Sequence, residues 1–162
     1  MEYVITGGAG FIGSNIAKLL LKEDHTVTIL DNLNTGKMEN IESIKNKINF
    51  VNGDIRDTTL LDNLFKNIDG VFHEAALASV QESFNKADEY HEVNVVGTEN
   101  IFKLAQQHGF KVVYASSSSV YGNPIKIPIE ESDPKNPINP YAQTKLDDEK
   151  LATEYARKGA RI

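Results

Sequence analysis

The chain has 162 residues, and 17 basic against 23 acidic side chains give it a formal net charge of −6 at pH 7. Its length fits a single compact domain over residues 1–162, and a hydrophobic share of 40% can fill the core of such a domain. The acidic balance and the lack of a basic stripe argue against nucleic acid as a partner, and the absence of cysteine excludes disulfide bonds and thiolate chemistry.

The sequence shows no sign of a membrane or metal partner. No apolar run is long enough to span a bilayer, and the first strand pattern begins without a charged and then apolar leader, so we expect a cytoplasmic protein. The spacing of the four histidines is not that of metal ligands, and no metal site is expected. These residues are His25, His73, His91 and His108.

Strand-like and helix-like patterns alternate along the chain. The predicted strands cover residues 2–6, 26–30, 48–52, 70–73 and 111–116. The predicted helices cover residues 11–22, 58–67, 90–107 and 141–158, and a polar loop with a short helix after it is predicted between residues 32 and 46. Such alternation is typical of an α/β fold in which helices cover both faces of a parallel sheet.

A glycine-dense segment, residues 6–13 with the sequence TGGAGFIG, follows the first predicted strand and leads into a helix. The glycines allow a tight turn that brings the backbone close to a phosphate. The N-terminus of the helix then faces the anion with unpaired N–H groups and its positive dipole end. This context predicts a pyrophosphate site.

The second predicted strand ends in Asp31, close to where a dinucleotide-binding unit has an acidic residue for the adenosine ribose hydroxyls. The alternative interpretation is a turn residue that follows a strand. The glycines upstream favour ribose binding. Because a carboxylate here would repel the additional phosphate of NADP, NAD is the predicted cofactor.

Two polar groups follow later in the chain. The serine run at residues 116–119 comes directly after an apolar strand, where parallel sheets bind ligands, although a run of serines is also typical of a flexible linker.

Tyr141 and Lys145 share one face of a helix that Asn139 and Pro140 begin. An ammonium beside a phenol favours the phenolate, so the pair could act as a base, or could lie on a solvated helix face.

Seven ordered blocks resemble the extended short-chain dehydrogenase/reductases, and within them the NAD-dependent nucleotide-sugar epimerases and dehydratases typified by UDP-glucose 4-epimerase. The blocks are residues 6–13, 31–33, 53–57, 73–76, 94–98, 117–122 and 141–145. The resemblance implies a doubly wound Rossmann-type parallel sheet, truncated here before the sixth strand and the substrate domain. Arg161 and Ile162 are similar to the start of that strand.

The resemblance also implies the site residues. The implied catalytic residues are Ser117, Tyr141 and Lys145. The implied cofactor-binding residues are Gly7, Gly10, Phe11, Ile12 and Gly13 at the pyrophosphate, Asp31 and Asn32 at the adenosine ribose, Asp54 and Ile55 at the adenine, and Ala75, Ala76, Leu77, Tyr141 and Lys145 farther along. Tyr141 would take the proton of a sugar C4 hydroxyl during transient oxidation to a 4-keto intermediate, with Ser117 orienting the oxygen.

Differences between this chain and the patterns of related enzymes indicate which activity within the family the resemblance favours. Dehydratases of this group usually have an Asp-Glu pair after the active serine or threonine, whereas this chain has Ser118 and Ser119, which disfavours elimination. Ala78 stands where UDP-glucose 4-epimerases often have a lysine, and its surroundings are closer to epimerases that accept N-acetylated or uronic-acid sugars. For His73 and Glu74 a structural role is favoured over a catalytic or metal-binding one.

Three kinds of function stay open at this point. The first is a UDP-sugar 4-epimerase, or a dehydratase or reductase of the same family. The second is an NAD-binding module without turnover. The third is an oligomerising remnant that forms a homodimer through the helices at 90–107 and 141–158, although helical periodicity favours the core for most of their apolar positions. These positions are Val95, Ile101, Leu104, Leu146, Leu151 and Tyr155.

Overall fold

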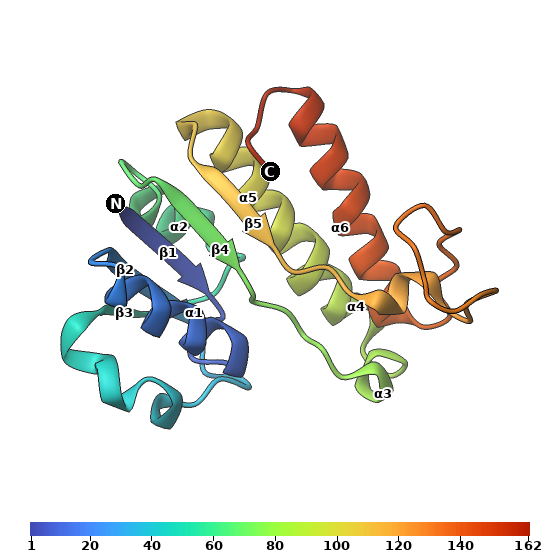
Figure 1. The fold of residues 1–162 in the computed structure, drawn as a ribbon, viewed down its shortest axis with the longest axis horizontal. Helices are drawn as coiled ribbons and strands as arrows, with labels where there is room; N and C mark the ends of the chain where they lie inside the picture. Colours follow the sequence, from blue (N-terminus) through green and yellow to red (C-terminus); the bar gives the residue numbers. More distant parts are fainter.

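The computed structural model describes residues 1–162 and contains one parallel sheet of five strands (Figure 1). The strands are β1 (Glu2–Thr6), β2 (Thr26–Asp31), β3 (Asn49–Asn52), β4 (Gly70–His73) and β5 (Lys111–Tyr114). Their order, β3-β2-β1-β4-β5, is that of a doubly wound fold, so the prediction of a Rossmann-type sheet is confirmed. The succession of strands changes direction between β1 and β4, which is where such sheets form a ligand crevice.

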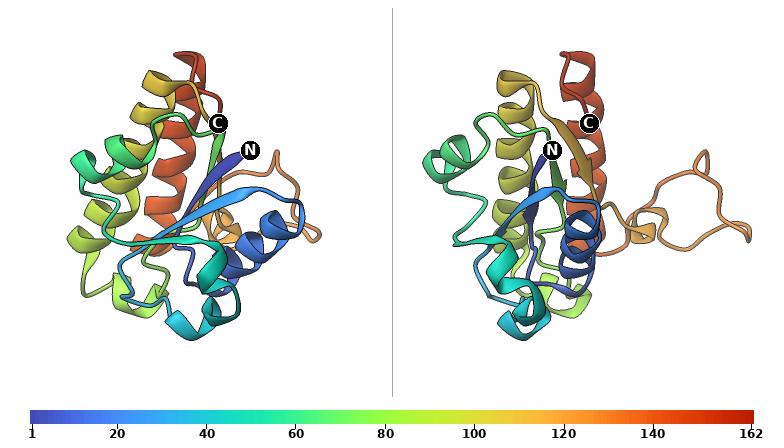
Figure 2. Two further views of the ribbon diagram at one scale, coloured as in Figure 1. Left: turned by 90° about the vertical axis from the view of Figure 1, so that its left-hand side faces the viewer. Right: turned by 60° about the vertical axis from the view of Figure 1, so that its left-hand side comes forward.

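Helices cover the sheet from both sides. They are α1 (Phe11–Lys22), η1 (Met38–Asn40), η2 (Glu42–Lys47), α2 (Thr58–Leu64), α3 (Val80–Ser83), α4 (Ala87–Tyr90), the π-helix η3 (His91–Val96), α5 (Gly97–His108), η4 (Ser118–Tyr121) and α6 (Pro140–Arg157). None of them is long and apolar enough to cross a membrane. Helix α1 lies on the opposite face of the sheet from α2 and α5 (Figure 2).

Two apolar cores fill the space between sheet and helices. The larger joins residues of β1, β4 and β5 to side chains of α2, α5 and α6, among them Leu61, Phe65, Phe102 and Tyr155. The smaller lies under α1 and contains Ile5, Ala17, Val27 and Ile29. Successive strand residues, such as Val4 and Ile5, enter opposite cores because side chains alternate across a strand.

The long predicted helices end and begin at recognisable signals. The Asn139 side chain accepts the N–H of Ala142 at 2.8 Å and Pro140 follows it, so the predicted start of α6 is confirmed. Gly109, with φ +79°, ends α5 in the left-handed conformation. Arg161 pairs with Lys111 as a parallel bridge, which confirms that the last two residues extend alongside β5.

Several predicted boundaries were wrong. The helix expected at 58–67 ends at Leu64; Phe65 still donates its N–H to the Leu61 carbonyl at 2.9 Å, and Asn67, with φ +62°, cannot continue the helix. The strand expected at 111–116 ends at Tyr114, since the serine run forms the cap and first residues of η4 and is no flexible linker. The single helix expected at 90–107 is α4, η3 and α5 in succession.

Four of the six apolar positions named for these helices serve the core. Ile101, Leu104 and Tyr155 are buried members of the larger core, and Leu151 packs against it, which confirms the interpretation favoured for them. Val95 and Leu146 are half-buried and belong to neither core, so the homodimer through these helices stays a prediction.

We expect Phe65→Ala to lower the free energy of unfolding by about 3–5 kcal/mol, because it leaves a cavity in the larger core. The Phe65 ring is fully buried and meets Phe110 edge-on with 5.2 Å between centroids. Phe84, which is 63% exposed, provides the control, and Phe84→Ala should change stability by no more than about 0.5 kcal/mol. Urea unfolding followed by circular dichroism measures both. Equal effects would contradict this description of the core.

Candidate functional site

A cleft of about 360 Å³ opens at the carboxyl ends of β1, β2, β3 and β4. It is formed by the segments that follow these four strands, so residues far apart in the sequence meet around one space. Most of the predicted cofactor residues line it, namely Gly7, Gly10, Asp31, Asn32, Asp54, Ile55, Ala75, Ala76 and Leu77. The predicted nucleotide end of the site is thus assembled by the fold itself.

The glycine turn forms one wall of the cleft and has no room for side chains. Gly7 has φ +68°, and a Cβ there would lie 2.7 Å from the backbone nitrogen of Ala75. A Cβ on Gly13 would lie 2.5 Å from the carbonyl oxygen of Gly7, so α1 packs directly against the turn. Gly10 is the N-cap of α1 and no side chain caps the helix, which leaves its first N–H groups free to bind an anion.

Phe11 and Ile12 begin α1 but do not line the cleft. Their side chains are 82% and 57% exposed and lie on the outer surface of the helix. Any contribution of these two positions to anion binding would therefore come from their backbone N–H groups at the helix N-terminus.

The Asp31 carboxylate has a structural role in the turn after β2, and it also lies on the cleft wall, where ribose binding stays a prediction. It lines the cleft, but it is buried, and its two oxygens accept the N–H groups of Ala9 at 2.9 Å and Leu33 at 2.8 Å. Gly36 lies against the same carboxylate, where a Cβ would come within 2.7 Å of both oxygens. Asp31 therefore fixes the glycine turn and the following loop while remaining on the cleft wall.

A second carboxylate, Asp54, lies farther along the cleft and is paired with a residue that the sequence analysis did not single out. Arg56 donates through Nε at 2.9 Å and Nη2 at 2.7 Å to the two carboxylate oxygens of Asp54. These hydrogen bonds hold the pKa of Asp54 below its ordinary value, and partial burial acts against them. The Asn32 amide also donates to Asp54, at 3.4 Å. The block at residues 53–57 contained Arg56 but gave it no role.

Asn94 is another residue that the sequence analysis left without a role, and it links Leu77 on the cleft wall to Thr144 of α6. Its buried side-chain amide accepts the N–H of Leu77 at 2.8 Å and donates to the Leu77 carbonyl at 3.0 Å. It also donates to Thr144 Oγ1 at 3.1 Å, and that hydroxyl donates to the Tyr141 carbonyl at 2.8 Å. Asn94 lies in the π-helix η3, a type of irregularity that is frequent at functional sites.

His73 has a structural role, as predicted. The ring is buried at the end of β4, with Nδ1 2.6 Å from Thr6 Oγ1 and Nε2 2.8 Å from Thr98 Oγ1. Burial, assisted by the nearby Lys145 charge, lowers the pKa of His73 to about 3. The imidazole therefore stays neutral and joins β1, β4 and α5. No group of three or more potential metal ligands occurs in the structure.

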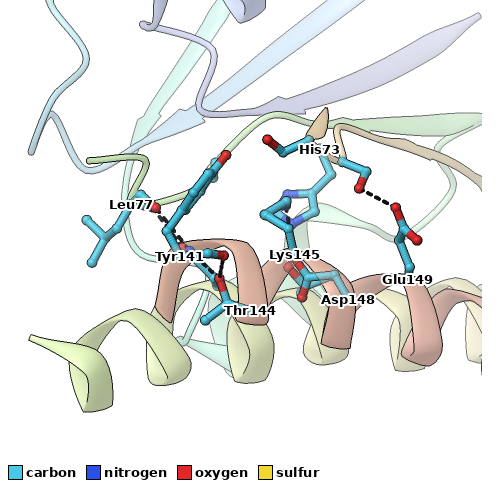
Figure 3. Close-up of polar contacts among 12 residues, drawn as sticks. His73, Leu77, Tyr141, Thr144, Lys145, Asp148 and Glu149 are labelled. Carbon is cyan, nitrogen blue, oxygen red and sulfur yellow. Dashed lines mark hydrogen bonds and ion pairs between the residues drawn. The ribbon is translucent and has the colours of Figure 1, made fainter. Parts of the chain in front are cut away.

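The predicted catalytic residues lie beside the cleft rather than on its lining. Tyr141 and Lys145 come from one face of α6, and the Tyr141 side chain extends past Leu77 toward the segment after β4 (Figure 3). Ser117 is the N-cap of η4, and its Oγ accepts the Ser119 hydroxyl at 2.8 Å. The side chain of Lys145 is only 4% exposed, and its Nζ binds Asp148 at 2.9 Å, so the alternative of a solvated helix face is wrong for this residue.

We expect Gly7→Ala to cost about 1–3 kcal/mol more in unfolding free energy than Gly109→Ala, because only Gly7 has a backbone neighbour where the methyl group would lie. Both residues have positive φ, so both substitutions carry the strain of about 1–2 kcal/mol that the left-handed conformation imposes on alanine. The difference between the two variants in urea unfolding isolates the contact with Ala75. Similar losses in the two variants would contradict the close approach.

We expect the His73 imidazole to stay neutral down to about pH 5, because its folded pKa lies well below the ordinary value near 6.5. The unfolded chain would then take up the proton first, so stability falls as pH decreases from 6.5 toward 3, by up to about 1.4 kcal/mol per pH unit from this group. Two-dimensional NMR of the ring carbons over this range measures the protonation. A titration midpoint near pH 6.5 would refute this prediction.

The glycine turn, the acidic residue at the end of β2 and the position of the cleft define a dinucleotide-binding α/β protein of the Rossmann type. A family model described as GDP-mannose 4,6 dehydratase matches residues 4–160, and the chain belongs to this family.

Related proteins agree with this assignment. A UDP-glucose 4-epimerase of Halalkalibacterium halodurans is 44% identical over 154 residues, covering 93% of this chain and 45% of that protein. A solved UDP-glucose-4-epimerase from Stenotrophomonas maltophila, with bound NAD and formylated UDP-arabinopyranose, matches with a TM-score of 0.92 at 35% identity, over 98% of this chain and 49% of that one.

The similarity extends to dehydratases. A solved dTDP-glucose 4,6-dehydratase from Streptomyces venezuelae, with NAD and TYD bound, has a TM-score of 0.92 at 35% identity, over 97% of this chain and 52% of that one. The chain thus spans about half the length of the relatives it matches.

Proposed function

We propose that this chain forms the NAD-binding half of a nucleotide-sugar 4-epimerase that acts on a UDP-hexose or UDP-N-acetylhexosamine. The observation that carries the proposal is the cleft, in which the glycine turn, Asp31, Asp54 and the 75–77 segment meet beside the helix that bears Tyr141 and Lys145. The epimerase names of the curated relatives and the NAD bound in solved neighbours support it.

The residues of the cleft fit a dinucleotide. The space beside Gly7 and Gly13 has no room for a Cβ, and the uncapped N-terminus of α1 offers N–H donors for a pyrophosphate. Asp31 and Asp54 supply carboxylate oxygens that can accept hydrogen bonds from ribose hydroxyls and the adenine amino group. Because the Asp31 carboxylate would repel a ribose phosphate, NAD is preferred over NADP.

Three side chains would take part in the proton transfer of the reaction. When bound, NAD would supply a reversible acceptor for the hydride at C4 of the sugar. The Tyr141 phenolate accepts the proton of the C4 hydroxyl, and Ser117 Oγ, held by Ser119, orients the oxygen. The Lys145 ammonium, one helical turn from Tyr141 on the same face of α6, donates to the Tyr141 oxygen and to a ribose hydroxyl of the cofactor.

Epimerisation is favoured over elimination by the residues after Ser117. Ser119 is held to Ser117 by a hydroxyl hydrogen bond and Ser118 is exposed, so neither position provides a carboxylic acid for the removal of water. A dehydratase is the second candidate, supported by the description of the family model and by the solved dTDP-glucose 4,6-dehydratase.

Isothermal titration with NAD and NADP tests the cofactor assignment. We expect NAD to bind at least about tenfold more tightly. Asp31→Asn should weaken NAD binding, because it disturbs the contacts to Ala9 and Leu33, and should reduce the preference, because it removes the charge on the cleft wall. Asp69→Asn is the control, since Asp69 binds the backbone N–H of Glu2 at the opposite end of the sheet. Equal affinities of the unaltered protein for the two cofactors would sink the NAD assignment.

Adding UDP-galactose to the NAD-loaded protein tests the substrate. Binding or turnover supports the epimerase, and Tyr141→Phe should then retain NAD and lose turnover, since it removes the proton acceptor. Binding of NAD without any effect of the sugar nucleotide would reduce the proposal to an NAD-binding module. Formation of a 4-keto-6-deoxy sugar from a nucleotide glucose would instead identify a dehydratase.

A further inference from the structure

Asp148 lies on the same face of α6 as the predicted catalytic pair. It follows Lys145 by three positions as Tyr141 precedes Lys145 by four, so the three side chains form one stripe along the helix. The Asp148 side chain is 0% exposed, and its Oδ2 accepts a hydrogen bond from Lys145 Nζ at 2.9 Å (Figure 3). Neither the motifs nor the mechanism above uses this carboxylate.

Asp148 is the only carboxylate in ion-pair contact with the ammonium. His73 is neutral and engaged with two threonine hydroxyls, and the Tyr114 ring lies 5.7 Å from Nζ. The carboxylate of Glu74 is half-buried on the cleft wall, and the one salt bridge that Lys145 makes is to Asp148. A buried ammonium without a partner is strongly unfavourable, so the location of this charge depends on Asp148.

The carboxylate itself is costly to keep in this place. Its Oδ1 is buried and has no hydrogen-bond partner, and burial raises the pKa of Asp148 to about 6 against the opposing effect of Lys145. A carboxylate that only packed in the core would gain nothing from this position, because an apolar residue of similar volume is usually as stable or more so. Packing therefore gives no reason for a carboxylate at this position, and the remaining interaction is its contact with the Lys145 ammonium.

We propose that Asp148 is a positioning residue, whose carboxylate holds the Lys145 ammonium in place on the face of α6 that also bears Tyr141. An ammonium has three N–H donors, and the bond to Asp148 uses one of them. The two others are oriented by that bond and are available for a ribose hydroxyl and for the Tyr141 oxygen. This inference rests on the proposed function, which assigns Lys145 to those two groups.

A double-mutant cycle on NAD affinity tests whether Asp148 acts through Lys145. We expect Asp148→Asn to raise the Kd for NAD by about tenfold, as is typical when a hydrogen bond to a charged group is lost, and to have no further effect in a Lys145→Met background. A purely structural role would give independent effects in the two backgrounds. Additive effects, or an unchanged Kd in Asp148→Asn, would therefore overturn the proposal.

Asp147→Asn is the matched control. It removes the same charge one residue earlier, where a side chain that is 31% exposed binds Lys150 and Gln143 instead. It should leave the Kd for NAD within about twofold, because exposed ion pairs contribute little. If Asp148→Asn does not fold, Asp148→Glu serves in its place, since it keeps the charge and displaces the carboxylate by one methylene. Unaltered NAD affinity in that variant would equally reject the positioning role.

A second measurement separates this inference from the proposed function. Proton–nitrogen NMR of the lysine ammonium groups should show a slowly exchanging Lys145 signal in the unaltered protein and in Asp147→Asn, and its loss in Asp148→Asn. This readout needs no cofactor. If the unaltered protein fails to bind NAD, the proposed function falls while the NMR result still decides whether Asp148 holds the ammonium. Persistence of the signal in Asp148→Asn would refute the proposal in either case.

Discussion

The close approach of two backbone segments shapes the whole cleft. Gly7 turns away from β1 directly against Ala75, which follows β4, and the contact leaves no space for a Cβ. The neighbouring residues repeat the connection, since the Thr6 carbonyl accepts the N–H of Glu74 and the Thr6 hydroxyl meets the His73 ring. The segments that follow β1 and β4 separate at this point, where the succession of strands changes direction. A ligand bound there would therefore be held by backbone from both halves of the sheet.

Buried side chains connect the segment after β4 to the helix that bears the proposed base. Asn94 binds both backbone groups of Leu77 and reaches Thr144, which in turn binds the carbonyl of Tyr141. Within that helix, Asp148 accepts a hydrogen bond from the ammonium of Lys145, which the proposed function also uses. A site assembled from buried amide and carboxylate contacts of this kind is oriented before a ligand arrives, which reduces the entropy lost on binding.

The features that could be predicted from the sequence are those written in consecutive residues. Local patterns predict three such features: the glycine turn, Asp31 at the end of a strand, and the Asn139 cap. All three are in the predicted places. The Arg56 contact is local as well, since Asp54 lies two residues earlier, and the sequence analysis overlooked it. The Asn94 contacts could not be derived in this way. Asn94 binds residues 17 and 50 positions away, and its π-helical turn has no periodicity of its own to reveal it. Asp148 resembles any other acidic residue of a charged helix until its burial is known.

The double engagement of Asp31 bears on how cofactor preference could change in this family. A carboxylate that also secures Ala9 and Leu33 cannot be exchanged for a neutral or basic residue without loosening the glycine turn. Asn32 is exposed beside it and makes weaker contacts. Substitutions that adapt the site to a phosphorylated cofactor would therefore disturb the fold less at Asn32 than at Asp31. The buried carboxylate would in this way oppose a change of cofactor.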